Sequence, residues 1–173
     1  MISTVMCTPR SRTFSTVCNL LTQRGEVIKV PASQETFVAS MHLRCNPGSE
    51  TMLPILFMSE EFMRRFYLKN EKPIGETEMV SFRLQQNEAD NLSIKIVDVG
   101  EKAEVTLREM LYFLGFADRT EWFIFCVRDI DDILLPVSVF WYTNVYGSGW
   151  SFDIDSVIES DERKELKLLV LRL

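Results

Sequence analysis

The sequence predicts an α+β fold in which a mostly antiparallel, twisted sheet is packed by two or three short helices. Strand-like and helix-like segments do not alternate regularly along the chain, as they would in a doubly wound parallel sheet. Several segments instead alternate apolar and polar residues with a period of two, which is typical of half-buried strands. Hydrophobic residues make up 46% of the chain and aromatic residues 11%, so the chain can fill a core.

The length of the chain, 173 residues, is ordinary for one domain that buries most of its apolar surface. The sequence contains no internal repeat, and its 7 glycines and 6 prolines are too few for a low-complexity chain. We therefore expect a single domain over residues 1–173, in which residues 1–12 form a loosely attached N-terminal arm.

The N-terminal part predicts a helix followed by two strands. A helix capped by Thr13 or Ser15 is expected to run to about Gln23 and to end at Gly25, because glycine tolerates the backbone of a helix C-terminus. Pro31 closes the first strand, and a turn at 46–48 follows the second. The two expected strands are Glu26–Val30 and Phe37–Arg44.

The next two elements are an extended segment and a second helix. Met52–Met58 is apolar but is interrupted by Pro54, so we expect an edge strand or a buried extended segment. Ser59 is placed to cap a helix, and two acids that follow it complement the positive end of the helix dipole. The apolar stripe of this helix comprises Phe62, Met63, Phe66 and Tyr67.

The middle of the chain predicts a hairpin and a third helix. Glu78–Leu84 and Leu92–Val97 both alternate, and a polar turn separates them, so we expect them to pair antiparallel. Thr106 and Glu109 form the pattern of a capping box, and Gly115 is suited to end the helix. The apolar positions of this helix are Leu107, Met110, Leu111 and Leu114.

The C-terminal part reads mostly as strands. Two buried strands are expected around an acidic turn at 128–132, and Gly147–Gly149 is expected to form the turn before the next strand. Leu166–Leu173 ends the chain as an apolar strand. The sequence leaves open whether that strand is central or lies at an edge, where self-association by strand pairing would follow. The first three strands are Glu121–Val127, Leu134–Tyr142 and Trp150–Ile154.

Charge and cysteine usage exclude several functional classes. The net charge is -6, which disfavours binding to nucleic acid, since phosphate contacts need clustered Lys and Arg. No stretch approaches the roughly 20 apolar residues that a membrane span needs. The four cysteines show no disulfide framework, so we expect a cytoplasmic protein. Residues 1–25 lack acids and are rich in Arg, Ser and Thr, which leaves organelle targeting as an alternative.

No catalytic or phosphate-binding motif is present, so we lean towards a non-enzymatic protein without a cofactor. His42 and Cys45 are the nearest nucleophile and base, but three positions along a strand put them on opposite faces. The alternative is a divalent-metal-dependent hydrolase or nuclease, because carboxylates from a turn and a strand can converge on Mg²⁺ or Ca²⁺. Aspartate is also a common turn former and cap. The candidate ligands are Asp129, Asp131, Asp153 and Asp155.

Aromatic residues crowd the region around Gly147–Gly149 and are the best candidates for a binding surface. Trp and Tyr on a rigid rim are the residues that interfaces favour, although the same residues are ordinary core components. The first hypothesis is therefore a small acidic domain that binds another protein, such as a regulator, an inhibitor or immunity protein, or a complex subunit. A small-molecule pocket under the same turn is a further alternative. The predicted partner-binding residues are Trp141, Tyr142, Tyr146 and Trp150.

Overall fold

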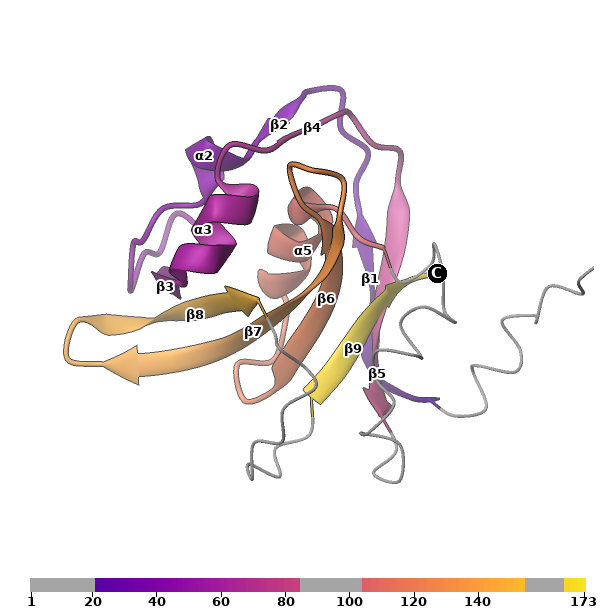
Figure 1. Cartoon of the computed structure of the whole chain (residues 1–173). Coiled ribbons are helices and arrows are strands. Elements are labelled where there is room, and N and C mark those ends of the chain that lie inside the picture. The colour runs from indigo at the N-terminus through magenta and orange to yellow at the C-terminus, as the bar shows by residue number, and fades with distance from the viewer. Residues whose placement is uncertain (1–20, 85–103, 155–166) are drawn as a thin grey trace, which may run out of the picture.

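The computed structural model describes residues 21–84, 104–154 and 167–173, and it has the predicted α+β fold. Seven strands form one twisted sheet in the order β1-β5-β9-β6-β7-β8-β3, and β2 pairs with β4 in a small second sheet (Figure 1). In the large sheet, β6–β9 and β3–β8 are parallel and the other neighbours are antiparallel. The elements are β1 (Leu21–Val30), β2 (Phe37–Val38), α2 (Ala39–His42), β3 (Ile55–Met58), α3 (Glu60–Phe66), β4 (Asn70–Glu71), β5 (Thr77–Leu84), α5 (Leu107–Leu114), β6 (Trp122–Arg128), β7 (Leu134–Asn144), β8 (Gly147–Ile154) and β9 (Lys167–Arg172).

Helices α3 and α5 lie on the same face of the large sheet, and the main core fills the space between them and the strands (Figure 1). Phe113 of α5 packs edge-on against Phe123 and Phe125 of β6. Phe62 of α3 stacks on Phe152 of β8 with ring centroids 5.3 Å apart. These contacts are the main reason that two short helices are stable, because helices of this length are marginal without packing.

Local capping begins both helices where the sequence predicts them to begin. The Ser59 side chain accepts a hydrogen bond from the backbone N–H of Phe62 at the start of α3. Thr106 and Glu109 form the complete reciprocal capping box at the start of α5. Gly115 stands at the C-terminal cap of α5, as expected. The structure thus confirms two of the predicted helices. Each begins at a cap whose residues lie close together in the sequence.

The predicted helix that ends near Gln23 is wrong over its described residues. Leu21–Val30 is strand β1, which pairs with β5 along most of its length. Gly25 does not end a helix; its φ of 80° lies within the bulge where the pairing register shifts, between Arg24 and Ile28. The ladder with β5 supplies the backbone hydrogen bonds that a helix would have supplied locally.

The predicted strand Phe37–Arg44 is also wrong. Two residues pair with β4, and the chain then makes the single helical turn α2. The turn buries Ala39 and Leu43, which are four residues apart and share one side of a helix. The rings of Phe37 and His42 stack with centroids 4.5 Å apart. Residues 37–44 alternate as a strand does, but packing in the folded protein favours a helical turn.

Strand pairing differs from the sequence prediction at β5 and decides between the two alternatives left open for β9. Strand β5 pairs with β1 and β9 instead of closing a hairpin with Leu92–Val97, which lies outside the described residues. Strand β9 lies between β5 and β6, so it is central, and the edge that self-association through Leu166–Leu173 would require is not present. Residues 168–171 are all buried, as in a strand covered on both faces.

Strand β3 takes the first of the two alternatives predicted for it, an edge strand. Among the described strands of the sheet it pairs only with β8, and Pro54 precedes it directly. None of the helices in the described ranges is long and apolar enough to cross a membrane. The predicted arm, residues 1–12, lies outside these ranges.

Candidate functional site

The β7–β8 hairpin positions all four predicted aromatic residues. The turn of this hairpin is Val145–Tyr146, and Gly147–Gly149 already belongs to β8, so the predicted position of the turn is wrong. The Asn144 side chain accepts a hydrogen bond from the Tyr146 N–H, which stabilises the turn. Gly147 has a φ of 132°, a backbone conformation that other residues rarely adopt.

The tryptophans and the tyrosines of the hairpin lie in different surroundings, because successive side chains of a strand alternate between its two faces. Trp141 and Trp150 are register partners on the face that the helices cover, with ring centroids 5.3 Å apart. Only 1% of Trp150 is exposed, and its ring also packs edge-on against Phe123. The prediction that Trp150 forms part of an exposed contact surface is therefore wrong. Trp141 is half-buried.

Tyr142 and Tyr146 lie at the surface near the end of the hairpin. Their exposed fractions are 52% and 82%, and Val145 between them is 92% exposed. We call these three residues the hairpin tip. On the sheet face opposite the helices, Tyr142 continues an aromatic row through Phe140 to Trp122. The row gives the tip a firm apolar base.

A groove lies between the hairpin and the end of helix α5. Its volume is about 720 Å³, and the loop 48–54 forms one wall. The opposite wall comes from α5 and the residues just after it. We call this cavity the tryptophan groove, because both Trp141 and Trp150 line it. Its remaining lining residues include Leu111, Tyr112, Leu114, Gly115, Phe116, Arg119 and Ser148.

Backbone contacts hold the 48–54 loop against the hairpin. The Gly48 N–H donates to the Ser148 carbonyl oxygen, and the Trp150 N–H donates to the Pro54 carbonyl oxygen. Gly149 makes this approach possible, since a Cβ there would lie 2.7 Å from the Leu56 nitrogen. The wall of the groove is therefore fixed by the sheet rather than by flexible side chains.

Arg119 is the cationic group of the tryptophan groove. Its guanidinium carbon lies 4.1 Å from the centroid of the Trp141 ring, a cation–π contact. None of the ion pairs within the described part of the chain includes Arg119. The groove thus combines apolar walls with one positive charge, Arg119, and one negative charge, Glu50.

A second groove lies on the other side of Tyr112 and Phe116, which line both cavities. Its volume is also about 720 Å³. Glu26, Asp118 and Glu121 line it together with one cation, Lys29, so its lining is more acidic than that of the tryptophan groove.

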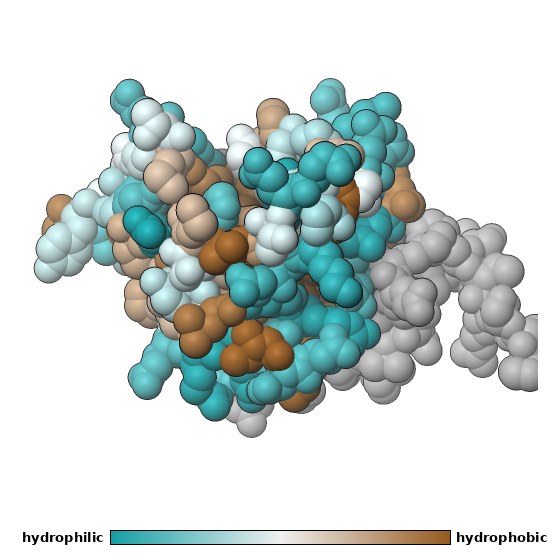
Figure 2. Space-filling view, turned by 90° about the horizontal axis from the view of Figure 1, so that it is seen from above, coloured by the Kyte–Doolittle hydropathy of each residue, from teal (hydrophilic) through white to brown (hydrophobic). Residues whose placement is uncertain are grey.

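Figure 2 shows that apolar side chains on the face of the molecule it draws lie in small groups among polar ones.

The three described aspartates of the alternative metal site do not form a group that could hold a metal ion. The side chain of Asp129 is fully buried and accepts hydrogen bonds from the backbone N–H groups of Asp131 and Ile133 and from Arg65. Burial alone would raise the pKa of Asp129, but these hydrogen bonds outweigh it and lower the pKa. Asp129 therefore holds the turn before β7 together.

Two of the other predicted metal ligands, Asp131 and Asp153, belong to the described residues. Asp131 lies near Arg65, at 3.7 Å, whereas Asp153 is exposed on β8. Asp155 lies outside the described residues. Where the structure describes the chain, no three His, Cys, Asp or Glu side chains are grouped to hold a metal ion. This geometry offers no support for metal-dependent hydrolysis.

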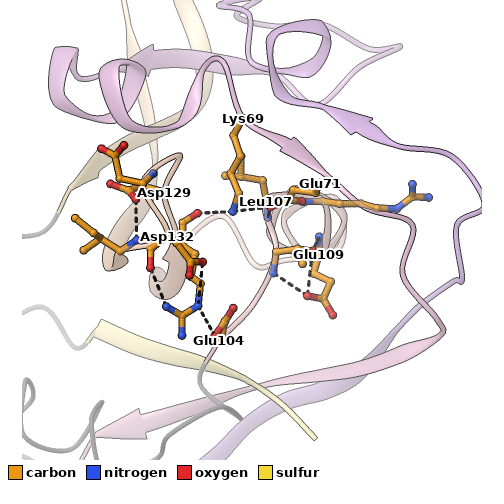
Figure 3. A network of polar contacts seen from close by, with 12 residues as sticks. Lys69, Glu71, Glu104, Leu107, Glu109, Asp129 and Asp132 are labelled. Carbon is orange, nitrogen blue, oxygen red and sulfur yellow. Dashed lines mark hydrogen bonds and ion pairs between the residues drawn. The ribbon is translucent and has the colours of Figure 1, made fainter.

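Two further buried acids have structural partners (Figure 3). Glu71 accepts hydrogen bonds from the backbone N–H groups of Leu107 and Arg108, at the positive end of α5, and pairs with Lys69. Glu109 accepts hydrogen bonds from Arg172, Thr106 and Thr77. Both carboxylates anchor α5, and neither lines one of the two grooves described above.

The pair His42 and Cys45 shows no catalytic arrangement in the structure. The ring of His42 stacks on Phe37, and burial together with the charge of Arg108 lowers the pKa of this histidine. Cys45 is exposed, whereas Cys126 is buried and its thiol pKa is raised to about 12 by burial. A thiol with such a pKa is not a nucleophile at neutral pH.

Sequence reasoning missed Arg119, Phe116 and the 48–54 loop as parts of a site. Arg119 precedes β6 and reaches a tryptophan in β7, so no spacing in the sequence links the two. The sequence offered one indication of a site here, which is the large apolar residue Phe116 just beyond the end of the helix. Its exposure follows from its place beyond Gly115, where the buried face of α5 has ended.

Comparisons with known proteins supply no relative from which a function can be transferred. What the protein does must therefore be argued from the chemistry of its own surfaces. The sequence matches no protein-family model, and no curated protein or solved structure is detectably similar to it.

Proposed function

We propose that this protein is a non-enzymatic interaction domain that binds another protein through the hairpin tip. The exposure of Tyr142, Val145 and Tyr146 at the end of a projecting hairpin is the observation that carries this proposal (Figure 1). Tyrosine is enriched among the residues that dominate binding energy, because it buries a large area and loses few rotamers.

The composition of the hairpin supports the same function. A quarter of the chain is charged, yet no Asp, Glu, Lys or Arg stands between Asp132 and Asp153. The centres of protein interfaces are depleted of charged residues in the same way. The rest of this chain is acidic, with a net charge of -6, which favours a partner with a basic rim around an apolar pocket.

The base of the hairpin is rigid enough to present the tip. The Trp141–Trp150 contact fixes one side, and the hydrogen bond from Gly48 to Ser148 fixes the other. Beyond Phe140, β7 pairs only with β8 within the described residues, so the last part of the hairpin extends past β6. A preorganised arm loses little entropy on binding.

Site-specific photocrosslinking in the protein's own host tests this proposal. A benzophenone amino acid replaces Tyr146 in one variant and Leu68, another highly exposed apolar residue, in the control variant. We expect one discrete adduct with another protein from position 146 and none from position 68. Combining Tyr142→Ser with Val145→Ser should abolish the adduct without changing the thermal midpoint.

Three outcomes would contradict the proposal. The first is no adduct from position 146, and the second is the same set of adducts from positions 146 and 68. The third is an adduct that contains two copies of this chain, which would replace the partner by self-association. Mass spectrometry of the adduct distinguishes the third outcome from a complex with another protein.

A further inference from the structure

The tryptophan groove is a concave site that is separate from the hairpin tip. Its volume, about 720 Å³, falls in the usual range for small-molecule pockets, roughly 300–1,000 Å³. We infer that it binds a small organic acid, in which a carboxylate is joined to an apolar body. This inference does not depend on the proposed protein partner.

Arg119 is placed to bind the carboxylate. Its guanidinium group lies against the Trp141 ring, 4.1 Å from the centroid. A guanidinium held in this way keeps N–H groups at its edge, and their planar fork matches the two oxygens of a carboxylate. The ion pairs found among the described residues leave Arg119 without an acidic partner.

The walls of the groove suit an apolar body. Met52 and Phe116 are both exposed although they are large and apolar, and they line the same cavity as Leu111 and Trp150. A ligand chain along these walls would remove apolar surface from water, which favours binding. Methionine adapts its shape to different ligands, so the site would tolerate several apolar bodies.

Charge explains why the acid would choose this groove over its neighbour. Both grooves have the same volume and share Tyr112 and Phe116. The neighbouring groove is lined by three acids and one lysine, whereas the tryptophan groove is lined by one acid, Glu50, and Arg119. A carboxylate is therefore repelled from the neighbouring groove, and a neutral chain of the same length would not distinguish the two.

Three probes that share a chain and differ in head group test this inference: decanoate, decan-1-ol and decylammonium. Binding is followed by the indole N–H signals in ¹H–¹⁵N NMR spectra, since the chain contains 3 tryptophans. Trp141 and Trp150 line the groove. Trp122 lies on the opposite face of the sheet, where its Nε1–H donates to Ser138, so its signal is an internal control. Trp122→Phe and Trp141→Phe assign the three signals.

We expect decanoate to shift the Trp141 and Trp150 signals but not the Trp122 signal, and to bind more tightly than the other two probes. Arg119→Gln should weaken decanoate binding by roughly tenfold and leave decan-1-ol unchanged, because only a charge-assisted hydrogen bond is lost. Arg119→Lys should restore part of the affinity, since it keeps the charge without the fork. Phe116→Ala should weaken the binding of decanoate and of decan-1-ol alike.

The control variant Arg83→Gln removes an exposed arginine from β5, and Tyr146→Ser alters the hairpin tip; both should bind decanoate as the unaltered protein does. Equal affinity for decanoate and decan-1-ol would overturn the inference. So would unchanged decanoate binding in Arg119→Gln, no binding of decanoate, or a shift of Trp122 as large as that of Trp141. Failure of the crosslinking experiment would leave this result unaffected.

Discussion

Trp141 and Trp150 face each other across the β7–β8 hairpin, with their ring centroids 5.3 Å apart and their planes at 85°. Trp150 belongs to the core, whereas Trp141 is half-buried and carries Arg119 on its ring. One cross-strand pair therefore joins the interior of the domain to the tryptophan groove. This relationship separates substitutions that test stability from substitutions that test binding.

The first prediction compares the stability effects of Trp150, which lies in the core, and Tyr146, which lies in the hairpin tip. Trp150→Ala should lower the free energy of unfolding by about 4 kcal/mol, because it leaves a large cavity in the core. Tyr146→Ala should change it by less than about 0.5 kcal/mol, since the side chain is 82% exposed. Urea denaturation measures both values. Similar losses for the two variants would show that the hairpin tip is packed rather than free.

The second prediction concerns the close approach of β3 to β8. In Gly149→Ala, the new Cβ would lie 2.7 Å from the Leu56 nitrogen and 2.9 Å from the Pro54 oxygen, and backbone atoms cannot yield as side chains do. We expect a loss of about 2 kcal/mol in the free energy of unfolding. We also expect faster hydrogen exchange at the Trp150 N–H, which donates to the Pro54 oxygen.

Gly75→Ala is the matched control, since a Cβ at Gly75 would have no neighbour within 4 Å. Its free energy of unfolding should stay within about 0.5 kcal/mol of that of the unaltered protein. An unchanged stability of Gly149→Ala would contradict the tight pairing described for this edge of the sheet.

The third prediction concerns pH and Glu109. Burial would raise the pKa of this glutamate, but hydrogen bonds from Arg172, Thr106 and Thr77 outweigh it, so the pKa in the folded protein lies below its ordinary value. The stabilisation is therefore fully present above the unfolded pKa of about 4.3 and is lost as pH falls through the folded value. The free energy of unfolding should decrease from about pH 5 downwards.

Glu109→Gln should destabilise the protein by about 3 kcal/mol at neutral pH, because it leaves the Arg172 guanidinium without its charged partner. The difference from the unaltered protein should shrink as the pH falls through the lowered pKa of Glu109, because the carboxylate then becomes protonated. Glu76→Gln, which alters an exposed glutamate, is the control. A difference that stays constant from neutral to acidic pH would refute the assigned role of Glu109.

Local signals account for the parts of the fold that the sequence predicted correctly. The capping box of Thr106 and Glu109 and the cap at Ser59 act within four residues, so their helices follow from the sequence. The antiparallel pair β6–β7 likewise needs only a short turn between two apolar runs. In contrast, the helical turn α2 depends on a segment far along the chain, since the Ala39 N–H donates to the carbonyl oxygen of Lys69.

The exposure of the predicted contact residues agrees with the sequence prediction in part. Tyr142 and Tyr146 lie at the surface as expected of contact residues, and alternation in a strand already separates Tyr142 from Trp141. Which of the two faces is covered by helices could not be read from that alternation, so Trp150 was assigned to the surface although it is buried. Arg119 was missed because its contact with Trp141 joins two separate elements.

By itself, the sequence determined the α+β class, two capped helices and an extended segment interrupted by proline, because each rests on backbone chemistry that acts over a few residues. Only the tertiary structure decided that β9 lies between β5 and β6, that β1 replaces part of a predicted helix, and that Arg119 meets Trp141. These outcomes depend on pairings between distant segments. The free energy of such pairings comes from burying surfaces together, and no single segment carries that information.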